Sequence, residues 1–197
     1  MVEEKDIWSD PNIWGDFDRA WETAKKEIFR LQLLDTYRVP GEEEEFERYL
    51  KGERVIPSKD FEDWKKQIAE SKNKGVRVVN LLVVDEPPSN YIRFSIDTYL
   101  METEKSGQET LIVKREDASP FTKSAIDFWM FDSMTVVPMK YDRVGHFLGT
   151  GKTVTEGPEL KEYAKLRDAL MDRAISLGKF IKQDNADRVT QKKKSTP

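Results

Sequence analysis

The segment Gly149–Thr153, with the sequence Gly-Thr-Gly-Lys-Thr, is the part of the chain closest to a catalytic loop. It ends like a phosphate-binding P-loop, and the apolar run before Asp85 and Glu86 resembles the strand that holds magnesium through its aspartate. A P-loop also needs an earlier glycine, separated from the second one by four residues, and a helix that begins at the lysine. His146 occupies the glycine position, and Gly157-Pro158 closes off any helix soon after the lysine. We expect a strand here and keep a nucleotide- or metal-dependent hydrolase, using this loop with Asp85 and Glu86, as the alternative function.

The single histidine and the absence of cysteine exclude several enzyme classes. A Ser-His-Asp site would have to use His146, and the chain has no Gly-x-Ser-x-Gly turn to supply the nucleophile. Zinc sites built from several imidazoles or from thiolates are excluded.

Carboxylates are the remaining source of chemistry. Oxygen ligands for magnesium, or an acid and a base, would require the fold to gather several of them. Asp132 and Asp142 each border a predicted turn, where aspartate often bonds to its own backbone. We therefore predict no catalytic residue, no metal site and no cofactor. The carboxylates considered are Asp85, Glu86, Asp127, Asp132 and Asp142.

Aromatic residues make up 11% of the chain, and most of them fall on predicted apolar faces. In the strand-like run from Asp127 to Asp132, Trp129 lies on the opposite face from Phe128 and Met130, so both faces need cover by helices or by a partner. The residues that we take as possible ligand or partner contacts are Arg93, Trp129, Asp132, Tyr141 and Asp142.

Helices are expected to dominate the first part of the chain. Apolar residues at steps of three and four predict a helix from Trp14 through Ile28 to Leu31. Two shorter helices follow, over 42–50 and from Pro57-Ser58 to before Gly75. We expect residues 1–74 to form a helical arm that packs on the rest of the domain, so that three helices precede the first strand.

The rest of the chain predicts a single α/β domain over 75–181, completed by the arm. The run 76–84 is apolar enough for a central strand. Residues 91–104 fit both a helical and a two-residue period; taken as a helix, they make 111–113 a second, parallel strand. An antiparallel meander follows over 127–149, then a closing helix from Gly157. We predict a mixed sheet of about five strands, regular structure that fades after Ile181, and a disordered polar tail over 182–197.

Composition limits the partners. The net charge of −4 argues against direct nucleic-acid binding, which depends on clustered lysine and arginine. No run approaches the roughly 20 apolar residues of a membrane span. The acidic first residues are unlike a secretory signal, and the lack of cysteine suits a reducing compartment, so we expect a cytoplasmic protein.

Most of the chain, from Phe17 to about Leu177, resembles an uncharacterised bacterial domain family that is common in actinobacteria and often encoded beside helix-turn-helix regulators. The resemblance rests on a scattered pattern: Phe29-Arg30-Leu31 with 37–40, 49–53, 91–94 with Tyr99, 128–132, Tyr141-Asp142, 147–149 and the helix 163–174. The resemblance implies no activity. The order of elements is also similar to half of a phospholipase-D-like domain, whose His-x-Lys pair is replaced here by His146-Phe147-Leu148, which implies that the catalytic lysine is lost.

These observations favour a non-catalytic regulatory or interaction protein, either a sensor of an unknown ligand or a docking module. The expected partner is a protein or a DNA-binding regulator.

Overall fold

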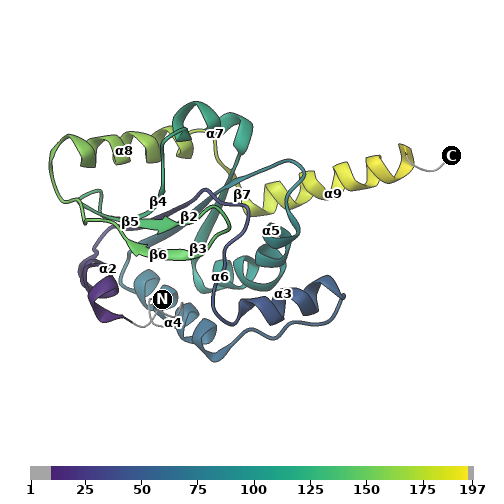
Figure 1. Cartoon of the computed structure of the whole chain (residues 1–197), viewed down its shortest axis with the longest axis horizontal. Coiled ribbons are helices and arrows are strands. Elements are labelled where there is room, and N and C mark those ends of the chain that lie inside the picture. Colours follow the sequence, from purple (N-terminus) through teal and green to yellow (C-terminus); the bar gives the residue numbers. More distant parts are fainter. Residues whose placement is uncertain (1–9, 195–197) are drawn as a thin grey trace.

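The computed structural model describes residues 10–194 and shows one mixed seven-stranded sheet in the order β6-β5-β4-β1-β2-β3-β7 (Figure 1). Strands β1, β2 and β3 run parallel to one another, and every other pairing is antiparallel. The strands are β1 (Glu27–Gln32), β2 (Arg77–Val84), β3 (Gln108–Lys114), β4 (Asp127–Phe131), β5 (Thr135–Tyr141), β6 (Phe147–Thr150) and β7 (Ile175–Ser176).

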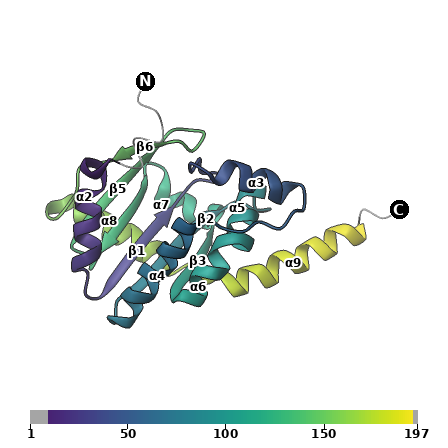
Figure 2. The same cartoon turned by 90° about the horizontal axis from the view of Figure 1, so that it is seen from below.

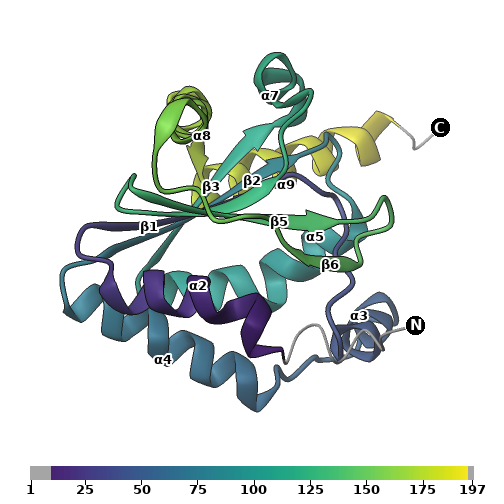
Figure 3. The ribbon, with the colours of Figure 1, turned by 60° about the vertical axis from the view of Figure 1, so that its left-hand side comes forward.

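Helices cover both faces of this sheet (Figure 3). Helices α7 (Arg115–Thr122) and α8 (Gly157–Met171) lie on one face. Helices α2 (Pro11–Thr23) and α4 (Lys59–Asn73) lie on the other, next to a continuous helical segment made of α5 (Asn90–Ser95), the π-helical turn η1 (Ile96–Leu100) and α6 (Met101–Ser106). Helix α3 (Glu42–Leu50) lies beside α5, and α9 (Leu177–Lys194) extends away from the sheet (Figure 2).

Several sequence predictions are confirmed. The fold is α/β with a mixed sheet, residues 91–104 are helical, and this helix connects two parallel strands, β2 and β3. Strands β4, β5 and β6 form the predicted antiparallel meander, and a helix begins at Gly157.

The helix predicted to run from Trp14 to Leu31 is wrong in its second half. Helix α2 ends at Thr23, and Glu27–Gln32 is strand β1, paired with β2 on one side and β4 on the other. Ile28 and Leu31 fit a helical stripe by spacing, but Phe29 between them is also fully buried, as a strand with two covered faces requires. Strand β1 therefore lies between helices α2 and α3 in the chain, where the sequence predicted helices alone. With β1 and the short β7, the sheet has seven strands instead of the predicted five or so.

Helix α9 continues to Lys194, so regular structure extends beyond Ile181, where the sequence predicted it to fade. Its first turn packs Leu177 and Phe180 into a cluster with Ile92 and Ile96 of the α5–η1 segment. Residues 195–197 of the predicted tail lie outside the described residues.

Trp129 is buried by helices, as the alternation in its strand predicts. It is only 5% exposed and lies within 6.0 Å, between ring centroids, of Phe17, Trp21 and Trp64, which come from α2 and α4. The opposite face of β4 contributes Phe128 and Met130 to the core under α8. The sheet is thus a central layer with an apolar core on each face.

Candidate functional site

Polar side chains interrupt the apolar face of the sheet at neighbouring positions in three parallel strands. Arg30 of β1 pairs with Asn80 of β2, which pairs with Thr110 of β3. These residues share a face with Gln32 and Gln108, because side chains two residues apart along a strand point the same way. A face between two layers is usually apolar, so a row of polar groups across its middle marks the floor of a site.

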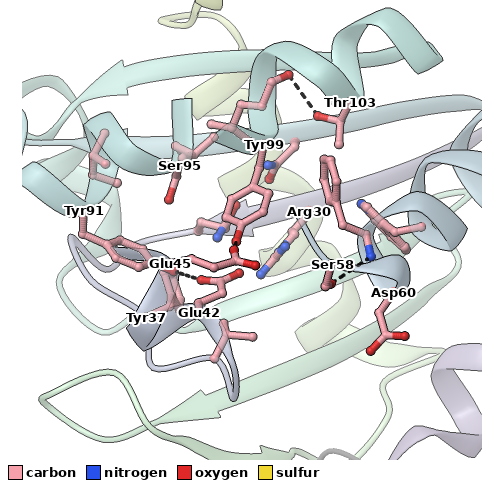
Figure 4. A pocket seen from close by; sticks show the side chains of 18 of the residues that line it. Arg30, Tyr37, Glu42, Glu45, Ser58, Asp60, Tyr91, Ser95, Tyr99 and Thr103 are labelled. Carbon is pink, nitrogen blue, oxygen red and sulfur yellow. Dashed lines mark hydrogen bonds between the residues drawn. The ribbon is translucent and has the colours of Figure 1, made fainter. Parts of the chain in front are cut away.

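A cavity of about 490 Å³ lies over this floor (Figure 4). That volume falls in the range of small-molecule sites in proteins. The strands form its floor, and α3, α4 and the α5–η1–α6 segment form its walls. The lining includes Arg30, Gln32, Asn80 and Gln108 from the parallel strands; Glu42 and Glu45 from α3; Ser58, Asp60, Phe61 and Trp64 from α4 and its N-cap; Ser95, Tyr99 and Thr103 from the π-containing helix; and Tyr37, Tyr91 and Tyr141.

The π-helical turn shapes one wall. A single π turn inside an α-helix adds a residue to the turn, and such turns often occur at functional sites. Here the turn carries Tyr99, with Ser95 just before it and Thr103 one turn later, and all three line the cavity. Tyr99 points across the cavity and donates a hydrogen bond to Glu45 (Figure 4).

The first turn of α3 forms an acidic wall opposite the helix. Tyr91 Oη donates to Glu42 Oε2 at 2.8 Å, which parallels the bond from Tyr99 to Glu45. Burial raises the pKa of Glu42 to about 7, although the bond from Tyr91 favours its charged form. Burial and the nearby Glu42 carboxylate also raise the pKa values of Tyr91 and Tyr99, so both phenols remain protonated donors.

Arg30 supplies the positive charge of the site. Its guanidinium lies 5.1 Å from the centroid of the Trp129 ring, a favourable cation–π distance, and it hydrogen-bonds to Tyr141. Burial raises the pKa of Tyr141 to about 12. Figure 4 shows Arg30 projecting toward Glu42 and Glu45. Among the side chains that the structure describes, no carboxylate forms an ion pair with Arg30, so the opposite charges face each other across the cavity.

Asn80 is the least satisfied polar group of the floor. Its side chain is 4% exposed, and within the part of the chain that the structure describes its Oδ1 atom accepts no hydrogen bond. Gln108, by contrast, donates to Thr103 at 2.8 Å and to Thr110 at 3.2 Å. A buried amide oxygen without a donor is unfavourable, so the cavity is suited to a ligand that brings an N–H or O–H group to Asn80.

Asp127 of β4 lies outside the lining and supports Tyr37, which lines the cavity. It accepts a bond of 2.5 Å from Tyr37 Oη and one of 3.0 Å from the Leu33 backbone N–H. Burial raises the pKa of Asp127 to about 6, and the bond from Tyr37 opposes that rise. Tyr37, itself 5% exposed, is thereby fixed in the cavity wall.

Among the residues proposed from the sequence, Tyr141 lines the cavity and Trp129 lies directly beneath Arg30. Arg93 lies outside the lining and bonds to both carboxylate oxygens of Asp184, at 2.6 and 3.2 Å, which ties α5 to α9. The structure therefore assigns Arg93 a contact between two helices of this chain.

Asp132 and Asp142 stabilise turns, in line with the alternative that the sequence favoured for them. The carboxylate of Asp132 accepts N–H bonds of 2.7–2.9 Å from residues 25–27, at the start of β1, and these bonds lower its pKa against the opposing effect of burial. Asp142 bonds to His146 Nδ1 at 2.8 Å and to the backbone N–H groups of Val144 and His146, and these bonds lower its pKa.

The geometry does not support the hydrolase alternative. Lys152 is exposed and follows edge strand β6, and the next helix begins only at Gly157. Asp85 instead follows β2, which three other strands separate from β6, so the two strands lie about 19 Å apart for strand spacings of about 4.8 Å. Asp85 is paired with Arg115 at 2.6 Å, and Glu86 with Lys114 at 2.8 Å. Lys152 and Asp85 thus cannot act on one magnesium–phosphate group.

A second hollow of about 440 Å³ lies at the carboxyl ends of the parallel strands and is more open. Asp35 lines this hollow and shares Arg115 with the neighbouring Asp85, at 3.0 and 2.6 Å. Burial and the neighbouring Asp85 raise the pKa of Asp35, whereas the interactions with Asp35 and Arg115 lower that of Asp85. Within residues 10–194, no group of three or more acidic or histidine side chains is arranged to hold a metal ion.

The sequence did not predict that one site would contain Arg30, Glu42, Glu45, Asn80, Tyr91 and Tyr99. A signal was present: Arg30 and Asn80 are isolated polar residues within strongly apolar segments. That signal could be used only once Glu27–Gln32 was recognised as a strand, because only then do the two residues become neighbours.

Comparison with known proteins places the chain in a family. Residues 15–182 match the family described as a domain of unknown function, DUF6879. The chain belongs to this family. The match contains all of the cavity-lining residues named above, so the cavity lies within the family domain. No curated protein matches the chain at a significant level.

One solved structure similar to this DUF6879 chain is that of TrmBL2, described as an archaeal chromatin protein with a novel mode of DNA binding. The identity is 13%, the match covers 84% of this chain and 51% of that one, and the TM-score is 0.46. The chain therefore corresponds to about half the length of TrmBL2, and a likeness at this level supports no statement about function. Within the described residues, no helix has the length and apolar character that crossing a membrane requires.

Proposed function

We propose that this DUF6879 domain is a non-catalytic sensor that binds a small organic molecule in the cavity between the sheet and helices α3, α4 and α5. The observation that supports this most is the polar floor of the cavity, where Asn80 lies beside Arg30 and its Oδ1 atom lacks a donor. Burying so many polar groups costs stability unless they have partners. A bound ligand would supply the partners that the chain itself leaves out.

The lining favours binding over catalysis. Glu42 and Glu45 each accept a hydrogen bond from a tyrosine, and burial disfavours the phenolate form that either tyrosine would need as a nucleophile. The raised pKa values of Tyr91 and Tyr99 keep these residues as hydrogen-bond donors at neutral pH.

Helix α3 is the element most suited to report ligand binding. It contains no fully buried residue, and its inner face is held by the bonds from Tyr91 to Glu42 and from Tyr99 to Glu45. A ligand that competes for these carboxylates would change how α3 sits on the domain. We propose that a protein partner, such as a DNA-binding regulator, recognises that change.

Occluding the cavity tests the proposal. Ser95 lines the cavity, so Ser95→Phe should fill it, whereas Ser119→Phe adds the same ring at an exposed position of α7 outside the cavity lining. A thermal-shift screen of a metabolite library should give stabilising compounds for the wild type and for Ser119→Phe but none for Ser95→Phe. If Ser95→Phe fails to fold, Ser95→Leu provides a smaller filler.

The proposal would be refuted by compounds that stabilise wild type and Ser95→Phe equally. Turnover of a library compound that is lost in Asp85→Asn and retained in Ser95→Phe would favour the hydrolase alternative instead.

A further inference from the structure

We infer that the ligand of the cavity is an organic cation with N–H donors, such as a protonated amine or an amidine, attached to a flat or aromatic body. This inference rests on the proposed function and names the ligand class of the same site. Charge, ring surface and hydrogen-bonding capacity of the lining each support it.

The charge of the lining is net negative. Its charged side chains are Arg30, Glu42, Glu45 and the exposed Asp60, so one positive group faces three carboxylates. Glu42 and Glu45 lie together in the first turn of α3 and converge on the same space (Figure 4). A cation placed there is attracted by both carboxylates in a region from which much of the water is excluded. An anion placed there would be repelled.

The rings around the carboxylates suit a cation as well. Tyr91 and Tyr99 hold the two carboxylates, and Phe61 packs against Tyr99 with ring centroids 5.0 Å apart. Tyr141, Tyr37 and Trp64 complete the aromatic surface. Aromatic faces attract cations, and they also accommodate a flat apolar body.

The hydrogen-bonding groups of the floor complete the pattern. Asn80 Oδ1 needs a donor, and the Glu42 and Glu45 oxygens can accept more than the one bond that each receives. Arg30 lies on the sheet side and would repel a second positive group. The ligand is therefore expected to carry its positive group toward α3 and a neutral or hydrogen-bond-accepting end toward Arg30.

Matched probes of one size test the ligand class. Benzamidine and benzylamine carry a positive group on a benzene ring, benzyl alcohol is the neutral counterpart, and benzoate is the anion. Saturation-transfer NMR and calorimetric titration at pH 8 should show that both cations bind at least ten-fold more tightly than benzoate and benzyl alcohol. The double variant Glu42→Gln/Glu45→Gln should weaken benzamidine at least ten-fold. Glu44→Gln, on the same helix but exposed and outside the lining, should leave it unchanged.

The outcomes separate the two proposals. Binding of benzoate or benzyl alcohol as tight as that of benzamidine, or cation binding that survives in the double variant, overturns the cation class and leaves the cavity as a ligand site. Failure of all four probes to bind at 10 mM, together with a metabolite screen without stabilising compounds, overturns the sensor function itself.

Discussion

At the residue scale, the site depends on charged and amide groups that are buried without complete partners. Arg30 is stabilised by the Trp129 ring and Tyr141, and Asp127 by Tyr37 and a backbone N–H. Asn80 has no equivalent support at its oxygen. Structural roles explain most of the polar groups of the site, and the exception, Asn80 Oδ1, lies in the floor of the cavity.

Tyr37→Phe should destabilise the domain. The change removes the hydroxyl that donates to Asp127 and accepts from the Leu34 N–H, leaving a buried carboxylate with one donor fewer. We expect a loss of about 1–3 kcal/mol in the free energy of unfolding, measured by urea denaturation at pH 7. Tyr163→Phe, in the core cluster under α8, is the control and should cost under about 0.5 kcal/mol. Equal losses in the two variants would contradict this role for Tyr37.

Glu42 should make stability fall as pH rises. Its pKa is about 7 in the folded protein and 4.5 in the unfolded chain, so the folded state binds more protons between these values. The stabilisation is complete below pH 4.5, decreases across the window and is lost once pH passes the folded pKa. Glu42→Gln should remove this fall, a difference of about 1–2 kcal/mol between pH 5 and 8 after allowance for partial exposure.

Urea unfolding at several pH values checks this, with Glu44→Gln as the control. Asp127 contributes its own fall between pH 3.8 and about 6, but it is present in all three proteins and cancels in the comparison. A wild type and a Glu42→Gln variant with parallel pH profiles would show that Glu42 titrates normally.

At the element scale, the strand β1 shows what the sequence could and could not predict. The strands β2 and β3, the helix between them, the meander and α8 follow from local patterns of apolar residues and turns. Residues 27–32 fit a helical stripe equally well, and what decides for a strand is hydrogen bonding to β2 and β4, which are distant in sequence. The site could not be assembled from the sequence for the same reason: Arg30, Glu42 and Asn80 meet only after β1 is placed.

Trp129→Ala should destabilise the protein by weakening the packing of the sheet against helices α2 and α4. The ring is 5% exposed and touches rings from both helices, so its removal leaves a large cavity and deprives Arg30 of its aromatic partner. We expect a loss of about 3–5 kcal/mol in urea or thermal unfolding. A loss below about 1 kcal/mol would mean that the region rearranges around the missing ring.

Helix α9 should depend on its ion pair with α5. The Arg93 and Asp184 side chains are 14% and 17% exposed, which places the pair under partial cover. Truncation after Gln183 removes Asp184, whereas truncation after Ala186 keeps it, so the two products differ by three residues. We expect the shorter one to be less stable by about 1–3 kcal/mol in urea unfolding, because Arg93 loses its charged partner. Equal stability would show that the pair contributes nothing to docking.

At the scale of the whole molecule, one face of the sheet is devoted to packing and the other is shared between packing and the cavity. The α7–α8 face carries an uninterrupted apolar core. The opposite face is apolar where it packs against α2 and where it meets α9. Between these two regions it is polar, and there α3, α4 and the π-containing helix surround the cavity. This division is consistent with a rigid frame that holds one ligand site.

An NMR titration of the ¹⁵N-labelled full chain with benzamidine, and separately with ATP and magnesium, tests most directly whether the cavity is the ligand site. The sensor proposal, taken with the cation class of its ligand, predicts that benzamidine shifts the backbone amides around Arg30, Asn80, Glu42 and Tyr99, and that these shifts vanish in Ser95→Phe. It predicts no saturable shifts from ATP and magnesium. Shifts confined to Gly149–Thr153 and Asp85, or benzamidine shifts that persist in Ser95→Phe, would contradict it.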